Sequence, residues 1–158
     1  MRVGYRDAAE RFSELAEQVG WCVAATTTPG GLPAAVILEP TWRWEGDVLA
    51  GLVAVESAGA VVRDVASTPA VVLLYRTADV TATVDCFAFA DADAPGAPER
   101  EVTLRLSLRR IKLCSDGADG GILEWRRPVT GSGGDPACWS HLMSEQSPSP
   151  HDVGRVEP

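Results

Sequence analysis

Residues 47–76 constrain the fold more than any other stretch, because they specify a strand, a short helix and a second strand in immediate succession. Apolar residues alternate over 48–54, which predicts the first strand. Residues 60–67 place three valines on one side of a helix, and Pro69 ends this helix because proline cannot continue it. Residues 70–75 are continuously apolar, which is typical of a strand buried on both faces.

The first segment of the chain has the periodicity of an amphipathic helix. Apolar residues recur at helical spacing over 8–19. Asp7 is expected to cap the amino end, with Glu10 three residues later, and Gly20 stands where a left-handed carboxyl cap is favoured. We expect this helix to cover the core as a lid or plug.

Three further strands are predicted from β-branched or alternating residues. Residues 21–28 form the first, and the turn at 29–31 joins it to a second strand over 33–44. Pro40 predicts a bulge or a sheet edge within this second strand. Residues 80–90 alternate between apolar and polar residues and predict a long strand.

The last predicted strands contain an irregularity. Apolar residues alternate over 101–113 but shift phase by one residue, which predicts a β-bulge at Arg109 and Arg110. A short strand follows at 121–125, and 128–158 has the composition of a loop and a mobile tail.

The pattern of the whole chain predicts a mainly β fold. It is a small barrel of about six to seven mostly antiparallel strands, with an N-terminal helix and a short helix between strands three and four.

Charge and composition narrow the range of partners. The 158 residues carry 14 basic and 22 acidic side chains, a formal net charge of −8, which disfavours nucleic acid and membrane surfaces as partners. No segment approaches the roughly 20 apolar residues of a membrane span, and no secretory signal is present, so we expect a cytoplasmic protein. The four cysteines form no CxxC pair and both histidines lie near the C-terminus, which predicts free, buried thiols and disfavours a zinc site.

Several motifs between residues 5 and 127 occur in the same order in a known family. They are the hairpin TTTPGGLP, the sequence STPAVVLLY and the strand LRLSLRRIKL. Together they resemble the split-barrel flavin-binding family related to pyridoxamine 5′-phosphate oxidase. The resemblance implies a split-barrel domain over 1–127, FMN as cofactor, and a homodimer with two flavin sites at the subunit interface.

The resemblance also implies where a cofactor would bind, namely on the second strand, on the turn and helix after the third strand, and near the last strand. Transferred to this chain, the candidate cofactor-binding residues are Val36, Ile37, Val55, Ser57, Gly59, Val61, Arg63 and Trp125. Family members carry an arginine near the position of Val36 and a Ser-Arg-Lys group at 59–61, so these cations are absent here. Each missing charge-assisted hydrogen bond is worth about 1.5–3 kcal/mol. The helix amides and Arg63 remain as candidate phosphate-binding groups.

Other residues have two interpretations each. Trp42 and Trp44 lie on one face of a strand, and either stack on a planar ligand or form an apolar patch at a dimer interface. Asp85 is either an acid or base inside the barrel or a solvent-facing residue. The basic residues at 109–112 are expected to form a solvated outer face.

Three functions fit these features. No nucleophile with a paired histidine can be assembled, so a cofactor must supply any chemistry. The first hypothesis is therefore an FMN- or deazaflavin-dependent oxidoreductase of unknown substrate. The alternative is a non-catalytic split barrel that has lost the phosphate site and, without a cofactor, serves as a small-ligand-binding or interaction domain. A third is an α+β barrel of the cyclase or isomerase kind with Asp85 as base.

Overall fold

A computed structural model describes residues 1–91, 100–118 and 120–129. Met1–Arg127 forms one compact unit. Almost all of the predicted tail at 128–158 and of the loop after residue 90 lies outside the described residues. The helices and strands of the described part follow in this order: α1 (Tyr5–Val19), β1 (Cys22–Thr27), β2 (Pro33–Leu38), β3 (Thr41–Glu45), β4 (Val48–Glu56), α2 (Ala60–Ser67), β5 (Ala70–Arg76), β6 (Val80–Ala90), β7 (Glu101–Ser115) and β8 (Ile122–Arg126).

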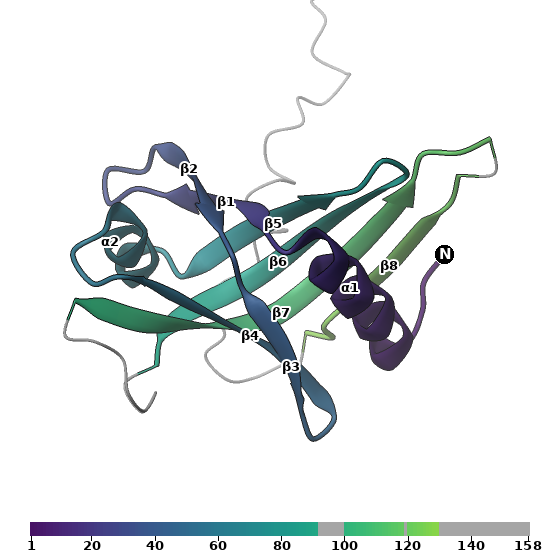
Figure 1. The fold of residues 1–158 in the computed structure, drawn as a ribbon, viewed down its shortest axis with the longest axis horizontal. Helices are drawn as coiled ribbons and strands as arrows, with labels where there is room; N and C mark the ends of the chain where they lie inside the picture. The colour runs from purple at the N-terminus through teal and green to yellow at the C-terminus, as the bar shows by residue number, and fades with distance from the viewer. Residues whose placement is uncertain (92–99, 119, 130–158) are drawn as a thin grey trace, which may run out of the picture. The chain divides into compact units, whose positions relative to one another are not determined.

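The strands form one antiparallel sheet that stays open at one place. Their order is β2-β1-β5-β6-β7-β4-β3, and β8 pairs with the second half of β7 (Figure 1). The two ends of this order, β2 and β3, are consecutive in the chain, so the sheet curls back on itself without a ladder between β2 and β4. This is a mainly β split barrel with an N-terminal helix and a short helix between strands, as the sequence predicted.

The predicted single strand over 33–44 is two strands, which corrects its length. β2 pairs with β1, whereas β3 pairs with β4, and the chain passes from one to the other at Glu39 and Pro40. Proline lacks an N–H and therefore cannot continue a ladder. The chain uses this break to cross the open side of the barrel.

The β-bulge predicted in β7 is confirmed. Asp85 pairs with Arg110, but the next residue of β6, Cys86, pairs with Leu108, so Arg109 is the extra residue. The shift keeps Leu108 and Ile111 both buried in the core. The apolar side of β7 therefore faces the core both before and after the bulge.

Helix α1 begins earlier than predicted, and Asp7 does not cap it. Gly4 occupies the N-cap position without a side-chain hydrogen bond, and Asp7 instead pairs with Arg11 at 3.2 Å. Packing decides the start, because the hydroxyl of Tyr5 accepts a 2.7 Å hydrogen bond from the Leu49 amide. The predicted left-handed carboxyl cap is confirmed at Gly20, with φ of 81°.

The two tryptophans of β3 pack beneath α1. Trp42 lies edge-on to Phe12 at 4.9 Å and donates a 2.9 Å hydrogen bond to the hydroxyl of Tyr75. Trp44 lies edge-on to Tyr5 at 6.3 Å. Both indoles therefore hold the helix to the barrel. Their contact with a planar ligand or with a dimer partner stays a prediction.

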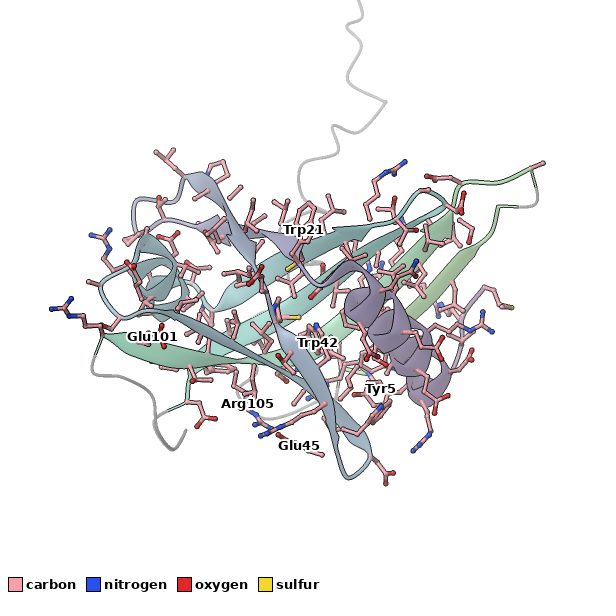
Figure 2. All side chains as sticks on the ribbon, viewed as in Figure 1. Tyr5, Trp21, Trp42, Glu45, Glu101 and Arg105 are labelled. Carbon is pink, nitrogen blue, oxygen red and sulfur yellow. The ribbon has the colours of Figure 1, made fainter. Side chains whose placement is uncertain are left out.

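Charged pairs join strands on the outer surface. Arg105 of β7 donates hydrogen bonds to both carboxylate oxygens of Glu45 at the end of β3, and this pairing lowers the pKa of Glu45 (Figure 2). Asp85 is half-buried and lies 3.5 Å from Arg110. Its neighbours Val84 and Cys86 face the core, so Asp85 points outward and is not a base inside the barrel.

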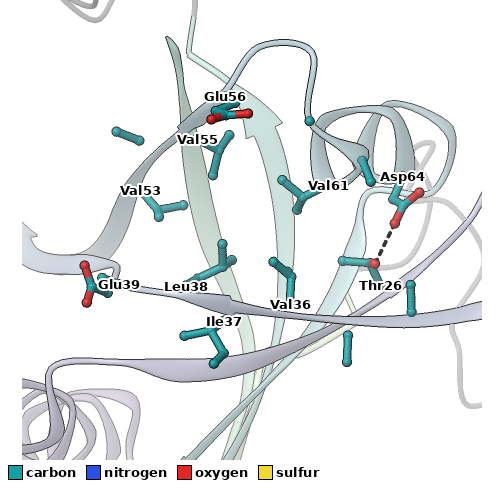
Figure 3. Close-up of a pocket in the computed structure, with 15 residues that line it drawn as sticks. Thr26, Val36, Ile37, Leu38, Glu39, Val53, Val55, Glu56, Val61 and Asp64 are labelled. Carbon is teal, nitrogen blue, oxygen red and sulfur yellow. Dashed lines mark hydrogen bonds between the residues drawn. The ribbon is translucent and has the colours of Figure 1, made fainter. Parts of the chain in front are cut away.

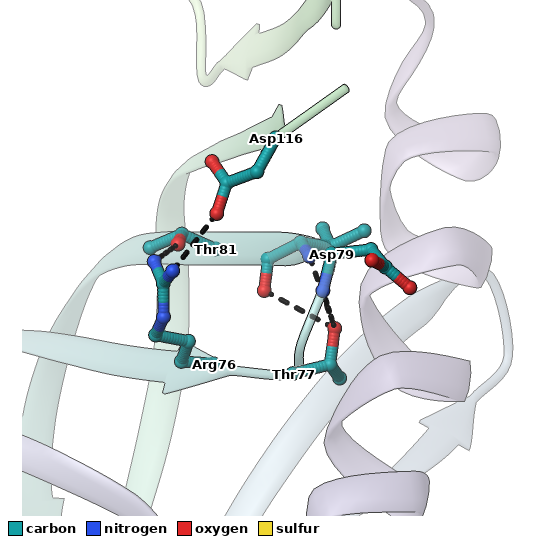
Figure 4. A network of polar contacts seen from close by, with 6 residues as sticks. Arg76, Thr77, Asp79, Thr81 and Asp116 are labelled. Atoms are coloured by element: carbon teal, nitrogen blue, oxygen red, sulfur yellow. Dashed lines mark hydrogen bonds and ion pairs between the residues drawn. The ribbon is translucent and has the colours of Figure 1, made fainter. Parts of the chain in front are cut away.

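The β5–β6 hairpin is fixed by its own polar side chains. The amides of Asp79 and Val80 donate hydrogen bonds to the hydroxyl of Thr77 (Figure 4). Arg76 then links the hairpin to the turn after β7 through a 2.9 Å ion pair with Asp116. These contacts explain why a turn without proline or glycine is well defined.

Strand β5 is buried on one face only, contrary to the prediction. Leu73 and Tyr75 lie in the core, whereas Leu74 is 42% exposed. The exposed side continues across β1 and β2, where Val23 pairs with both Leu74 and Ile37. An apolar strip therefore crosses three strands on the outside of the barrel.

The cysteines agree in part with the prediction. Cys22 and Cys86 are free and buried, and burial raises the pKa of each thiol. Cys114 is free but half-buried, and Cys138 lies outside the described residues. None of the described helices has the length and apolar character needed to span a bilayer.

Candidate functional site

The open side of the barrel contains a groove of about 620 Å³ between β2, β4 and α2. β3 covers one edge of β4 only as far as Leu52, so Val53–Glu56 border the groove along that edge. β2 borders it from the opposite side, because its ladder to β1 uses its other edge. The groove exists because the sheet does not close here, and its volume is in the range of small-molecule sites.

The walls of the groove are apolar. Val36 and Leu38 project from β2, and Val53 and Val55 project from β4 to face them (Figure 3). Val61 enters from the first turn of α2. Alternation along both strands brings these side chains to one side, and together they form a surface suited to a flat, apolar molecule.

A buried polar pair closes the end of the groove at α2. The hydroxyl of Thr26 in β1 donates a 2.8 Å hydrogen bond to the carboxylate of Asp64 in α2 (Figure 3). Both residues are only 5% exposed. The pair fixes α2 against the barrel and leaves a carboxylate in the lining of the groove.

The amino end of α2 also borders the groove. Gly59 occupies its N-cap position, and the Gly59 amide donates a 2.9 Å hydrogen bond to the carbonyl of Glu56. The Gly59 amide is therefore already engaged. The amides of Ala60 and Val61 follow in the first turn, where helix N–H groups lack intrahelical acceptors.

Within the described part of the chain, the lining carries negative charge and no positive charge. Glu39, Glu56 and Asp64 contribute carboxylates, and none of the described lining residues is a lysine, arginine or histidine. Arg63, the candidate cation of the sequence analysis, is exposed on α2 and does not line the groove. Ser57 is likewise exposed and outside the lining.

The structure brings together most of the candidate cofactor-binding residues but not all of them. Five lie in the lining of the groove: Val36, Ile37, Val55, Gly59 and Val61. Figure 3 shows Ile37 pointing away from the cavity, on the opposite side of β2 from Val36. Trp125 lies elsewhere, with its ring 4.7 Å from that of Tyr5 under α1.

The residues predicted from the sequence do not include the polar residues of the groove, which are Thr26, Glu39, Glu56 and Asp64. The position of Asp64 could have indicated one of them, because Asp64 follows Val61 by three residues and therefore lies on the apolar side of the predicted helix. A charged residue at such a position requires a partner.

An antiparallel sheet that curls into a barrel and stays open along one side, with a short helix beside the opening, has the architecture of the split-barrel class of proteins. No protein-family model matches the sequence, and no curated protein matches it significantly. Solved structures do match by fold.

Three of these structures illustrate the likeness. A pyridoxamine 5′-phosphate oxidase-related, FMN binding protein from Nostoc punctiforme has a TM-score of 0.63 at 11% identity, over 80% of this chain and 92% of its own. A protein from Clostridium acetobutylicum, related to general stress protein 26 and of the pyridoxinephosphate oxidase family, has a TM-score of 0.60 at 8% identity, over 77% and 95%. A heme binding protein from Mycobacterium smegmatis has a TM-score of 0.59 at 16% identity, over 78% and 60%. The chain has the fold of pyridoxamine 5′-phosphate oxidase-like proteins, as its motifs predicted.

The groove does not fit the cofactors that these names suggest. The FMN phosphate is a dianion that needs charge-assisted hydrogen bonds from cations, and the lining offers carboxylates in their place. Heme needs an axial ligand such as histidine, cysteine, methionine or tyrosine, and residues 1–91, 100–118 and 120–129 place none of these in the lining. The apolar walls suit a planar ring, but the charges do not suit a phosphate or a propionate.

Proposed function

We propose that this protein is a non-catalytic split-barrel protein that binds a small, flat organic molecule in the groove between β2, β4 and α2, and that it has lost the phosphate site of flavin-binding relatives. The observation that carries the proposal is the lining itself. Apolar side chains form its walls, and the charged side chains among its described residues are all acidic. A site of this composition binds through apolar contact and excludes the flavin phosphate.

A flavin- or deazaflavin-dependent oxidoreductase is the second candidate. Two features favour it: the fold is shared with an FMN binding protein, and the amino end of α2 borders the groove. A helix of this length offers only its first-turn amides and a partial positive charge to an anion. The carboxylate of Glu56 lies beside these amides and opposes the binding of an anion, so we rank this function second.

We further propose that the protein is a cytoplasmic homodimer whose sites lie at the subunit interface. The apolar strip of Ile37, Val23 and Leu74 supports self-association, because two copies of a chain with a net charge of −8 need an uncharged contact. Ala25 and Ala35 pair beside the strip and are small enough to allow close approach. The strip begins on β2, the strand that also borders the groove.

Binding experiments with two flavins separate the two functions. Riboflavin has the ring of FMN without its phosphate, so isothermal titration with both reports the phosphate contribution directly. A flavoenzyme binds FMN far more tightly than riboflavin and is purified with the yellow chromophore. The proposed function predicts colourless protein and no advantage for FMN.

A groove-filling variant tests the location of the site. Val55→Trp occupies the cavity and should abolish saturable binding of N-phenyl-1-naphthylamine, a flat apolar probe. Val48→Trp changes a residue of the same strand that is 48% exposed and does not line the groove, so binding should persist. Equal probe binding by both variants would show that the ligand site lies elsewhere.

A further inference from the structure

We infer that the groove selects its ligand by charge, accepting uncharged or cationic organic molecules and rejecting phosphates, sulfonates and carboxylates. The inference rests on the proposed function, since it names the class of molecule that the same groove binds. Three carboxylates from three different elements carry it: Glu39 follows β2, Glu56 ends β4, and Asp64 belongs to α2.

The three carboxylates surround the apolar walls. Figure 3 shows Glu39, Glu56 and Asp64 on three sides of the cavity, with Val36, Val55 and Val61 between them. A ligand that covers the valines therefore lies between these acidic groups. Like charges repel more strongly across a low-dielectric groove than in open water.

Asp64 contributes the least screened of these charges. It is 5% exposed, and its partner is the neutral hydroxyl of Thr26. Within the described part of the chain, no lysine or arginine forms an ion pair with Asp64. A buried carboxylate without a counter-charge favours a cation beside it and disfavours an anion.

Glu56 lies beside the amino end of α2, which would otherwise attract an anion. The backbone of Glu56 lies directly beside the amino end of α2, since its carbonyl accepts the Gly59 amide at 2.9 Å. An added Cβ at Gly59 would stand 3.0 Å from that carbonyl and 3.7 Å from the Glu56 Cβ. A carboxylate attached at this point opposes the partial positive charge of the helix end.

The other polar groups that the structure describes in the groove are neutral. The edges of β2 and β4 that border the cavity present backbone N–H and C=O groups, which accept hydrogen-bonding partners without preference for an anion. The ligand class is therefore a flat apolar body with neutral polar groups or a protonated amine. The carboxylates exclude ligands of similar shape that carry a negative charge.

Two probes of matched shape test the charge selection. N-phenyl-1-naphthylamine is uncharged, and 1-anilinonaphthalene-8-sulfonate has the same rings with one negative charge. Only the binding that Val55→Trp removes is counted, and Val61→Phe, which fills the groove from α2, serves if the first variant fails to fold. We expect the uncharged probe to bind about tenfold or more tightly than the anionic probe at low ionic strength, and the ratio to shrink as salt is added.

Variants of the groove carboxylates test whether these groups cause the preference for the uncharged probe. Glu39→Gln combined with Glu56→Gln should tighten binding of the anionic probe at least about threefold and leave the uncharged probe unchanged. Asp47→Asn alters the net charge at a side chain that is 99% exposed and outside the lining, so it should leave both affinities unchanged.

The outcomes separate the two proposals. Equal or tighter groove binding of the anionic probe overturns the charge selection and leaves the proposed ligand site intact. A response to Asp47→Asn as large as that to the groove variants also overturns it, because the effect would then come from net charge. Absence of groove binding by both probes overturns the proposed function, and the charge selection with it.

Discussion

The hydroxyl of Thr26 and the carboxylate of Asp64 form a 2.8 Å hydrogen bond between β1 and α2, in a place where each side chain is 5% exposed. The bond joins two residues that are 38 positions apart in the sequence. It holds the helix that forms one wall of the groove. The geometry of the groove therefore depends on a buried polar contact as well as on its apolar walls.

Thr26→Val should lower the free energy of unfolding by about 1–3 kcal/mol, because it keeps the side-chain shape and removes the donor to a buried carboxylate. Urea unfolding followed by tryptophan fluorescence measures the change. Thr27→Val is the matched control, since Thr27 is the next residue of β1 and its side chain is on the outer face. A loss as large in the control would assign the effect to the strand and not to the hydrogen bond.

Gly51→Ala should destabilise the protein by about 1–3 kcal/mol through overpacking. A Cβ at Gly51 would lie 2.9 Å from the Trp42 ring and 3.1 Å from the Leu106 Cβ, so the indole would have to move from its place under α1. Gly121→Ala is the control, because nothing lies within 4 Å of its added Cβ. Thermal unfolding measures the melting temperatures of both variants. Equal melting temperatures would contradict the close packing around Gly51.

Glu124→Gln should reduce the loss of stability in acid. Hydrogen bonds from Arg126 at 2.7 Å and Arg110 at 2.9 Å lower the pKa of Glu124 from its ordinary value of 4.5 in the folded chain. The unfolded chain consequently binds a proton first as pH falls below about 4.5, so this contribution to stability is present above that pH and lost below it. Urea unfolding between neutral and acid pH should give a shallower decline for the variant.

Glu17→Gln provides the comparison for the pH experiment, because it neutralises an exposed carboxylate of α1. Its decline of stability with falling pH should match that of the wild type. If Glu124→Gln showed the same decline, the arginine pair would have no part in the acid sensitivity.

Ile37→Asp should dissociate the proposed homodimer. Ile37 is 66% exposed in the single chain and lies at the β2 end of the apolar strip, so two copies would bring two new carboxylates together. Sedimentation velocity measures the association state. Val48→Asp, at an exposed position on β4 away from the strip, should leave it unchanged; a wild-type monomer at all concentrations would refute the proposed dimer.

Local patterns were sufficient for most of the fold. The helix at 60–67 has the predicted bounds, because valines at helical spacing and Pro69 act within the segment itself. The bulge at Arg109 could be predicted from a phase shift of one residue. The motifs in their order indicated the split barrel, which the solved structures match.

Predictions failed where a distant residue decided the outcome. Asp7 has the sequence pattern of a cap, yet the helix starts earlier because Tyr5 reaches the Leu49 amide. Trp42 could equally have faced a ligand, and only the fold placed it between Phe12 and Tyr75.

The sequence alone determined most of the strands and helices, and the absence of cations at the positions where the flavin-binding family that its motifs resemble carries them, because periodicity and residue type are local properties. Only the tertiary structure decided that Glu39, Glu56 and Asp64 share one cavity and that Trp125 lies outside it. Their proximity arises where the barrel fails to close, and the closure of a sheet depends on pairing between strands far apart in the chain.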